Sequence, residues 1–318
     1  MFCNIENFKN IIIIENMMLW KGLDLPKNFK KTKIKEKNPL ISVIIPTYNE
    51  EEDIEECIKS VLKQNYKKIE IIVIDDSSSD RTVDKVKKFK EVRLFIQKHK
   101  GPGEARNLGA EKAKGEILIL IDADMVLFPD YVERLTKPLI ENKALGTIES
   151  IQYNMFKSKM QECCGKYVRL KELEGENSLV TRAITKQDFI DLGGFDRRYG
   201  YADDKTFYFK YGIKFLILKD VKCYHKTPQT WRGVYMHSGW IGSSTSLRWI
   251  NVPVANLFYI LFLYLFSPLI IPALSIRQVY KIKKPGLLFP YMLVFMAARY
   301  FGTLRGYLRR IFFKINVR

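Results

Sequence analysis

The stretch ILILIDADMVLFP, residues 117–129, decides the fold, because a continuous apolar run ends in two aspartates separated by one alanine. An apolar run of this length between Gly115 and Pro129 is typical of a strand buried on both faces of a parallel sheet. Asp122 and Asp124 then lie at its carboxyl end, where open α/β sheets bind ligands, and on one face of the extended segment, because side chains repeat every second residue. Two carboxylates this close repel each other unless a cation lies between them. The alternative is that one caps the next helix and the other is solvated.

The preceding segments predict alternating strands and helices. Three more apolar runs have the pattern of strands, namely ISVIIP (41–46), EIIVID (70–75) and VRLFIQ (92–97). Between the first two, Asn49 is expected to cap a helix that buries Ile54, Ile58, Val61 and Leu62. The alternation predicts an α/β fold with a doubly wound, mostly parallel sheet.

Composition excludes several classes of protein. The net charge of +18 is concentrated between Lys205 and Arg318, where eighteen lysines and arginines accompany one acidic residue, Asp220. No nucleic-acid-binding motif goes with this charge, so no nucleic-acid partner is expected. The five cysteines contain no C-x-x-C pair, which argues against a disulfide framework and against a zinc site.

Two long apolar stretches predict a membrane-associated C-terminus. Residues 252–276 contain no charge and residues 285–304 contain only Arg299, and a helix needs about 20 apolar residues to cross a bilayer. Pro268 and Pro272 leave a re-entrant or in-plane helix open, and a buried hairpin of core helices is the other alternative. Because the N-terminus lacks the features of a signal peptide, the rest of the chain is expected in the cytoplasm, at the cell membrane.

The ends of the predicted strands carry acidic residues where other nucleotide-binding folds carry glycines. PTYNE (46–50) follows the first strand, at the position of G-x-G-x-x-G in a dinucleotide-binding enzyme, and no P-loop occurs. Asp75 and Asp76 follow the second strand, although a turn-forming role for Asp75 is the alternative. Carboxylates on adjacent strand ends suit Mg²⁺ or Mn²⁺, which shares its other positions with phosphate oxygens and water. A sugar nucleotide would bring such phosphates.

Four motifs occur together in this chain: PTYNE (46–50), IDDSSSDRT (74–82), GPGEARNLGAEKAKGEILILIDAD (101–124) and GGFDRRYGYADDKTFYFKYG (193–212). In combination they resemble glycosyltransferase family 2, whose members are inverting enzymes of the GT-A fold. The resemblance implies a GT-A domain over residues 40–230. Its nucleotide-binding half would span 40–125 and its acceptor half 126–230. An N-terminal arm or linker (1–39) would precede it, and an interfacial segment (231–251) and membrane-associated helices (252–318) would follow.

The resemblance also implies roles on the donor side. Asp124 would hold the metal, Mn²⁺ or Mg²⁺, and Asp122 would face the ribose. Asp76 is the candidate for contacting the base of the nucleotide. The family's first nucleotide-side loop is matched by Pro46, Tyr48 and Glu50, and its A-R-N segment by Arg106 with Asn107.

On the acceptor side, Asp203 and Asp204 stand where family members commonly have Glu-Asp. The resemblance makes Asp204 the catalytic base and leaves Asp203 to orient the acceptor. His225 matches a histidine near the metal or diphosphate, with a structural histidine as the alternative. Trp231 and Arg232 could line the acceptor channel, although a membrane surface would explain both without a catalytic role.

The expected activity is that of a metal-dependent inverting glycosyltransferase of the hexosyltransferase type at the cytoplasmic membrane face. It would move a sugar from a nucleotide-diphosphate donor, a UDP-sugar or else a GDP-sugar, to a hydroxyl of a lipid-linked or cell-surface polysaccharide. One alternative is a polyprenyl-phosphate glycosyltransferase of the dolichyl-phosphate mannose synthase type, whose anionic acceptor needs no general base. The other is a non-catalytic membrane scaffold with a degenerate nucleotide fold.

Overall fold

The computed structural model describes residues 25–26, 29–153, 159, 162–163, 177–226, 228, 230–244, 262, 264–281 and 288–313. Of the expected N-terminal arm, only Leu25, Pro26 and residues from Phe29 onward are therefore described, and the expected interfacial segment is described for residues 231–244.

Strands and helices alternate through the first part of the described chain, as the sequence predicts. In order they are β1 (Ile41–Thr47), α2 (Ile54–Leu62), β2 (Ile69–Asp75), α3 (Thr82–Val86), β3 (Val92–Ile96), α4 (Pro102–Lys112), β4 (Ile117–Leu120), β5 (Met125–Leu127) and α5 (Tyr131–Ile140).

The second part is less regular. It contains β6 (Gly146–Tyr153), β7 (Asn177–Ser178), β8 (Ala183–Thr185), α7 (Lys186–Asp191), the 3₁₀ helix η1 (Arg197–Lys205), α8 (Thr206–Tyr211), β9 (Phe215–His225), α9 (Trp231–Ser244), α11 (Ser267–Lys281) and α12 (Phe289–Phe313).

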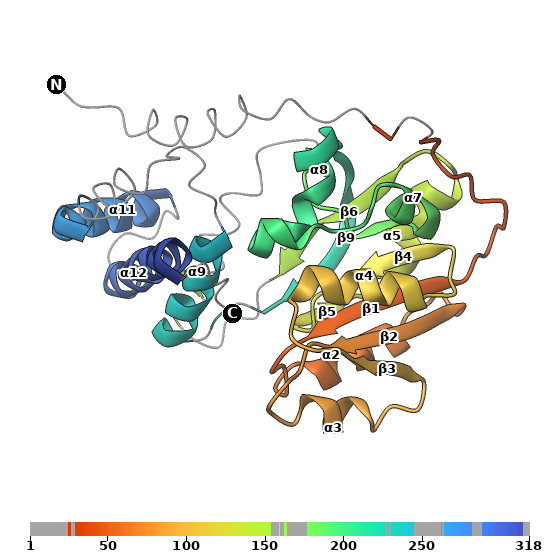
Figure 1. Cartoon of the computed structure of the whole chain (residues 1–318), viewed down its shortest axis with the longest axis horizontal. Coiled ribbons are helices and arrows are strands. Elements are labelled where there is room, and N and C mark those ends of the chain that lie inside the picture. Colours follow the sequence, from red (N-terminus) through yellow and green to blue (C-terminus); the bar gives the residue numbers. More distant parts are fainter. Residues whose placement is uncertain are drawn as a thin grey trace.

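The strands form one mixed sheet in the order β3-β2-β1-β4-β8-β6-β9-β5, and β7 also pairs with β9 (Figure 1). The first four strands are parallel, as predicted. Beyond β4 the pairings with β8, between β8 and β6, and between β9 and β5 are antiparallel. The α/β class is thus confirmed, whereas the mostly parallel order holds only for the nucleotide-side half.

Helices cover both faces of the sheet because side chains alternate along each strand. Val43 and Ile45 face the layer that contains α2 and α5. Ile44 faces the opposite layer, where α4 lies so close that a Cβ at Gly109 would come within 2.4 Å of the Ile44 side chain. Glycine at that position therefore permits the close contact of helix and strand.

The start of α2 differs from the prediction. Asp53, and not Asn49, stands at its N-cap position. Asn49 instead adopts φ of 56°, in the left-handed region, and its Oδ1 accepts a hydrogen bond from the Ser79 amide at 2.8 Å. Asparagine tolerates this conformation better than most residues, so it can join the loop after β1 to the loop after β2.

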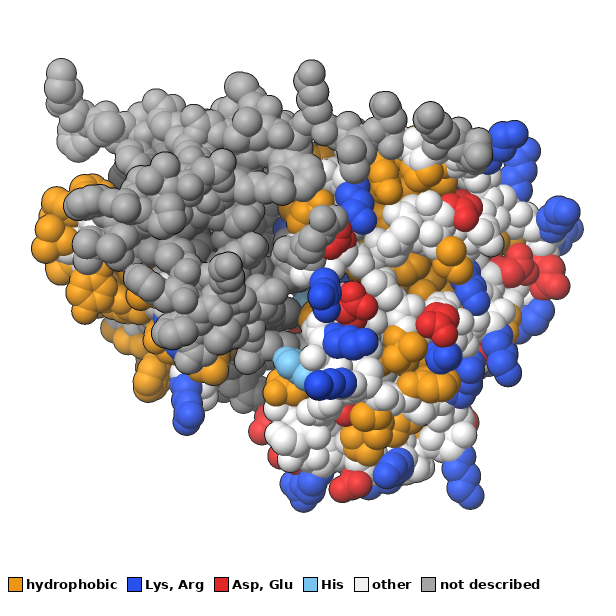
Figure 2. Space-filling view, viewed as in Figure 1, with side chains coloured by type: hydrophobic (Ala, Val, Ile, Leu, Met, Phe, Trp, Pro, Cys, Tyr) orange, Lys and Arg blue, Asp and Glu red, His pale blue; other side chains and the backbone are white. Residues whose placement is uncertain are grey.

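The C-terminal helices form a separate cluster with its own apolar core. Val234 of α9, Val279 of α11, and Met292 and Phe295 of α12 are buried together. Figure 1 shows these three helices side by side, away from the sheet. Figure 2 shows apolar side chains exposed on this side of the molecule. Leu269 and Tyr280 of α11 are each 71% exposed.

The predicted membrane-crossing helices are not found, and the cell-membrane location that rested on them is wrong. Within the described residues, no helix combines the length and the apolar character that a bilayer requires. Helix α11 has only 15 residues, and α12, with 25, carries Arg299 and Arg305 within its length. Residues 252–261 and 263 of the first apolar stretch lie outside the described part of the chain.

Candidate active site

The predicted donor-side residues gather at the carboxyl ends of β1, β2 and β4. Pro46 lies inside β1, buried, opposite Ile74 of β2. The pairing of β1 with β4 ends at Ile44, so the missing N–H of Pro46 removes no bond of the sheet. Glu50 follows the strand, and its amide donates to Oγ1 of Thr82 at 2.8 Å. The first loop is therefore fixed to the start of α3.

Asp76 organises the loop between β3 and α4. Its carboxylate is buried and accepts hydrogen bonds from the amides of Lys100 and Gly101, each at 2.8 Å, and from Nε2 of Gln97 at 2.7 Å. Nδ1 of His99 lies 2.9 Å from the same carboxylate. The His99 ring lies against that of Tyr48, with centroids 4.5 Å apart. Sequence reasoning gave His99 no role, yet the loop presents it beside a predicted donor residue.

Arg106 joins the donor and acceptor halves. From α4, its Nη2 donates to Oδ1 of Asp122 at 2.5 Å, and its Nη1 lies 3.3 Å from Oδ1 of Asp203. Burial alone would raise the pKa of Asp122, but the guanidiniums of Arg182 and Arg106 hold it well below its usual range. Asp122 is therefore an anion held by two arginines, one of which lies outside every motif of the sequence.

Asp124 and His225 meet although they lie 101 positions apart in the sequence. Strand β5 pairs with β9 so that Met125 lies opposite His225, and the Lys226 amide donates to the Asp124 carbonyl at 3.1 Å. Nε2 of His225 then lies 3.2 Å from Oδ1 of Asp124. The sequence predicts the two aspartates on one face of an extended strand, but β4 ends at Leu120, and a turn follows in which the Met125 amide bonds to the Asp122 carbonyl.

Asp122, Asp124 and His225 can each offer a ligand atom within 4.8 Å of the others. Carboxylate oxygens with one imidazole fit a cation such as Mn²⁺, so the donor set agrees with the predicted metal site. Burial lowers the pKa of His225, but the Asp124 and Asp122 carboxylates outweigh burial and raise that pKa to about 9. In the absence of a metal the histidine is therefore charged at neutral pH.

Asp203 and Asp204 differ in their surroundings. Asp203 packs against the first turn of α4 and against Arg106; burial and Asp204 raise its pKa to about 7, although Arg106 acts in the opposite direction. Asp204 is half-buried; desolvation raises its pKa, and its buried Oδ1 finds no hydrogen-bond partner among the described residues. The second aspartate is therefore the one with an uncommitted oxygen.

The remaining acceptor-side candidates lie on the first turn of α9. Trp231 is 59% exposed and Arg232 is also exposed. Helix α9 packs against η1, which carries the two aspartates, and against α12. Both side chains thus lie on a helix that borders the site, without a contact to the carboxylates.

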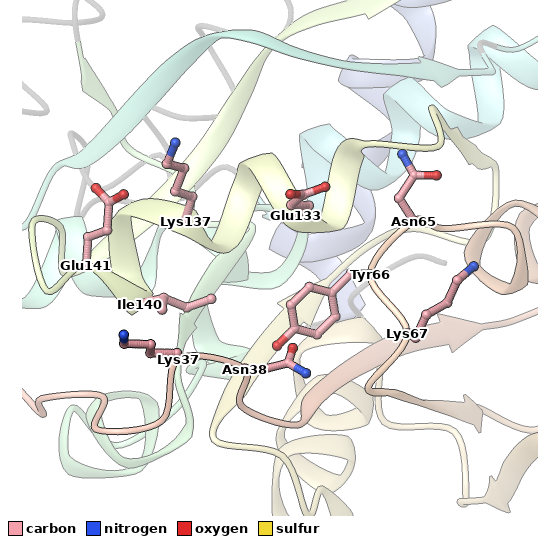
Figure 3. Close-up of a pocket in the computed structure, with 9 residues that line it drawn as sticks. All are labelled: Lys37, Asn38, Asn65, Tyr66, Lys67, Glu133, Lys137, Ile140 and Glu141. Carbon is pink, nitrogen blue, oxygen red and sulfur yellow. The ribbon is translucent and has the colours of Figure 1, made fainter.

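A pocket of about 560 Å³ lies elsewhere in the molecule (Figure 3). Lys37 and Asn38 precede β1, Tyr66 and Lys67 precede β2, and the other side of the pocket is formed by α5. It therefore opens at the amino ends of the parallel strands, opposite the edge that carries the aspartates.

Comparison with known proteins shows similarity to glycosyltransferases in part of the chain. Residues 42–195 match the model of the family described as glycosyl transferase family 2. An uncharacterized glycosyltransferase of Haemophilus influenzae is 38% identical over 114 residues, covering 34% of this chain and 46% of that protein. Glycosyltransferase GlyA of Streptococcus pneumoniae is 38% identical over 108 residues, covering 33% of this chain and 16% of that protein. Residues 42–195 are thus similar to glycosyltransferase family 2, and the chain spans less than half the length of these relatives.

Among solved structures, S. aureus TarS 1–349 in complex with UDP gives a TM-score of 0.47 at 18% identity. The alignment covers 85% of this chain and 90% of that one.

Proposed function

We propose that this protein is a metal-dependent inverting glycosyltransferase that moves a sugar from a nucleoside-diphosphate donor to a hydroxyl group. The observation that carries the proposal is the convergence of Asp122, Asp124 and His225 with Arg106 and the Asp203–Asp204 pair at one edge of the sheet. These residues come from four separate segments, and the fold brings them together beside a cluster of donor-side loops.

Asp124 and His225 would hold the metal, which would supply Lewis-acid stabilisation for the leaving diphosphate, and Asp122 beside them would face the ribose of the donor. The donor itself would meet the loops after β1 and β3. Tyr48 and His99 provide an aromatic surface for the nucleobase, and Asp76 supports it through the Lys100 and Gly101 amides. This arrangement makes Asp76 a residue that positions the base-binding loop. A UDP-sugar is the first donor to test and a GDP-sugar the second.

Asp204 would act as the general base. It would take the proton of the acceptor hydroxyl as the oxygen attacks the anomeric carbon, while the bond to the diphosphate breaks on the opposite face of the sugar. Its Oδ1, which has no hydrogen-bond partner among the described residues, supports this role over that of Asp203, which Arg106 already engages. The acceptor we propose is a hydroxyl of a lipid-linked or polymeric glycan.

Transfer to a polyprenyl phosphate is the second candidate function. A phosphate acceptor is already an anion and needs no base, so a buried carboxylate with a free oxygen would have no task in that reaction. A non-catalytic role fits less well still, because the sequence retains every carboxylate of the four motifs.

The experiment is a donor panel. Binding to the folded protein raises its melting temperature by mass action, so UDP-, GDP- and dTDP-sugars are compared with and without Mn²⁺. The donor that shifts the melting temperature is then incubated with oligosaccharide acceptors and separately with a polyprenyl phosphate, and the anomeric configuration of the product is determined. We expect a metal-dependent shift with one nucleotide and an inverted product on a hydroxyl. Failure of every donor to bind would contradict the proposal.

A further inference from the structure

Arg182 lies beside the Asp122 carboxylate, on the side opposite Arg106. Its backbone is held between two strands: its carbonyl accepts from the Leu120 amide at 2.7 Å, and its amide donates to the Thr147 carbonyl at 2.9 Å. The side chain, 8% exposed, therefore starts from a fixed point at the end of β4, the strand that leads to the aspartates.

The guanidinium of Arg182 makes contacts in two directions. Nη1 donates to Oδ2 of Asp122 at 3.0 Å, and Nε donates to Oε1 of Glu149 at 3.3 Å. Glu149 is fully buried at its side chain, and its Oε2 accepts from the Tyr131 hydroxyl at 2.9 Å. A chain of buried polar groups thus runs from Tyr131 on α5 to the candidate metal site.

Stability alone is a poor explanation for this chain of contacts. Buried ion pairs are often replaced by apolar side chains of similar volume with little loss, since desolvation offsets their attraction. Nor does Asp122 need a second cation for neutralisation, because Arg106 already contacts its Oδ1. What the second arginine adds is orientation: with one guanidinium on each oxygen, the plane of the Asp122 carboxylate is fixed.

We propose that Arg182 is a positioning residue for sugar transfer: held by Glu149, it fixes the orientation in which Asp122 meets the nucleotide donor. The inference rests on the function proposed above. The proposal gives Arg182 and Glu149, two buried charged residues outside the motifs, a role in sugar transfer. It therefore extends the active site to the side chains behind Asp122.

The test compares Arg182→Met and Arg182→Lys with Arg134→Met, a matched control on α5 whose side chain is half exposed and pairs with Asp130. Misplacement of a positioning group by about 1 Å can cost on the order of a hundredfold in rate. We therefore expect Arg182→Met to lower kcat/KM for the donor by roughly ten- to a hundredfold, Arg182→Lys to recover part of the loss, and Arg134→Met to behave as the unchanged protein.

A double-mutant cycle separates positioning from a general effect on the fold. If Arg182 acts through Asp122, then Arg182→Met added to Asp122→Asn should weaken UDP binding in the presence of Mn²⁺ no further, as measured by calorimetry. Glu149→Gln, a milder change, should weaken UDP binding in the otherwise unchanged protein and should have no further effect in the Asp122→Asn variant. The positioning role would be overturned if Arg182→Met weakened UDP binding equally in the unchanged protein and in Asp122→Asn. Normal transfer by Arg182→Met would also overturn it. Absence of transfer by the unchanged protein would instead overturn the proposed function.

Discussion

Arg106 lies against Asp203, with Nη1 of the arginine 3.3 Å from Oδ1 of the aspartate. The contact joins α4, in the nucleotide-side half, to η1, in the acceptor-side half, across 97 positions of the sequence. Because the same guanidinium also holds Asp122, a change in either half reaches the other through one buried side chain. It also leaves Asp204, the neighbour of Asp203, free for another task.

The two aspartates should therefore respond differently to neutralisation. Asp204→Asn should lower the transfer rate by about 10²–10⁴ while donor affinity stays nearly unchanged, because a general base acts in the chemical step. Asp203→Asn keeps the shape of a residue that packs on α4 and should lose less. The measurement is kcat and donor dissociation constant for both variants. Normal transfer by Asp204→Asn would show that the assignment is wrong.

Metal binding should depend strongly on pH. With its pKa raised to about 9, His225 carries a proton at neutral pH that a bound cation must displace. The apparent Mn²⁺ affinity should therefore rise by up to about tenfold per pH unit between pH 6 and 8, and Asp124→Asn should weaken binding at every pH. Titration calorimetry measures the Mn²⁺ affinity of the unchanged protein and of the Asp124→Asn variant at each pH.

The exposed Asp130, changed to Asn, serves as the control for Asp124→Asn, since it lies on the loop before α5. An Mn²⁺ affinity that does not change with pH would mean that His225 is not a ligand.

The sequence predicts the parallel half of the fold well, because each element there follows from a local pattern. Continuous apolar runs indicate β1, β2, β3 and β4, and the residues that follow these runs are therefore correctly expected at one edge of the sheet. The helical periodicity of Ile54, Ile58 and Val61 is confirmed by their burial, whereas Leu62 is 41% exposed.

The rest depends on long-range pairing that no local pattern contains. His225 reaches Asp124 because β5 pairs with β9, and Arg182 reaches Asp122 because β8 pairs with β4. The C-terminal helices mislead for a related reason: a stretch apolar enough for a bilayer can also pack against other helices, as Ile271 and Phe295 do. Composition alone does not distinguish these two surroundings.

Stability should fall as the pH rises from 5 to 7, partly through Asp203. Its pKa is about 7 in the folded protein against a usual 3.8, so in this window the unfolded chain loses a proton that the folded one retains. The loss is at most about 1.4 kcal/mol per pH unit for one group. Asp203→Asn should therefore make the free energy of unfolding less dependent on pH. Urea unfolding at pH 5 and pH 7 measures this free energy for the unchanged protein and for Asp203→Asn. The same change between the two pH values in both proteins would contradict the prediction.

The crossing of α9 and α12 depends on Gly302. A Cβ there would lie 2.2 Å from the Tyr235 carbonyl oxygen and 2.9 Å from Cβ of Ser238. Gly302→Ala should thus destabilise the protein by roughly 1–3 kcal/mol through overpacking, although alanine favours helices. Thr303→Ala, one position further along α12, should cost less. Thermal unfolding compares the two, and a more stable Gly302→Ala variant would disprove the close crossing.

Gly103, on the first turn of α4, gives the sharpest test of the contact between the two halves. Helix propensity alone predicts that Gly103→Ala stabilises the protein by about 0.5–1 kcal/mol. The structure predicts the opposite for activity, because the new Cβ would lie 2.6 Å from Oδ2 of Asp203 and push that side chain from its place against Arg106. We expect transfer to fall roughly tenfold or more while the helical circular dichroism signal is retained.

Shortening the aspartate removes the two closest contacts and leaves only its Cβ, 3.1 Å from the new Cβ, so Gly103→Ala should cost much less transfer when it is added to Asp203→Ala. Glu104→Ala, the next position on the same turn, serves as the control for a change in helix composition. If Gly103→Ala lowers transfer equally in both backgrounds, the glycine acts on the donor loop and not on Asp203. If it lowers transfer only when the aspartate is present, α4 and η1 form one unit, and the space beside Gly103 is what lets Asp203 reach Arg106.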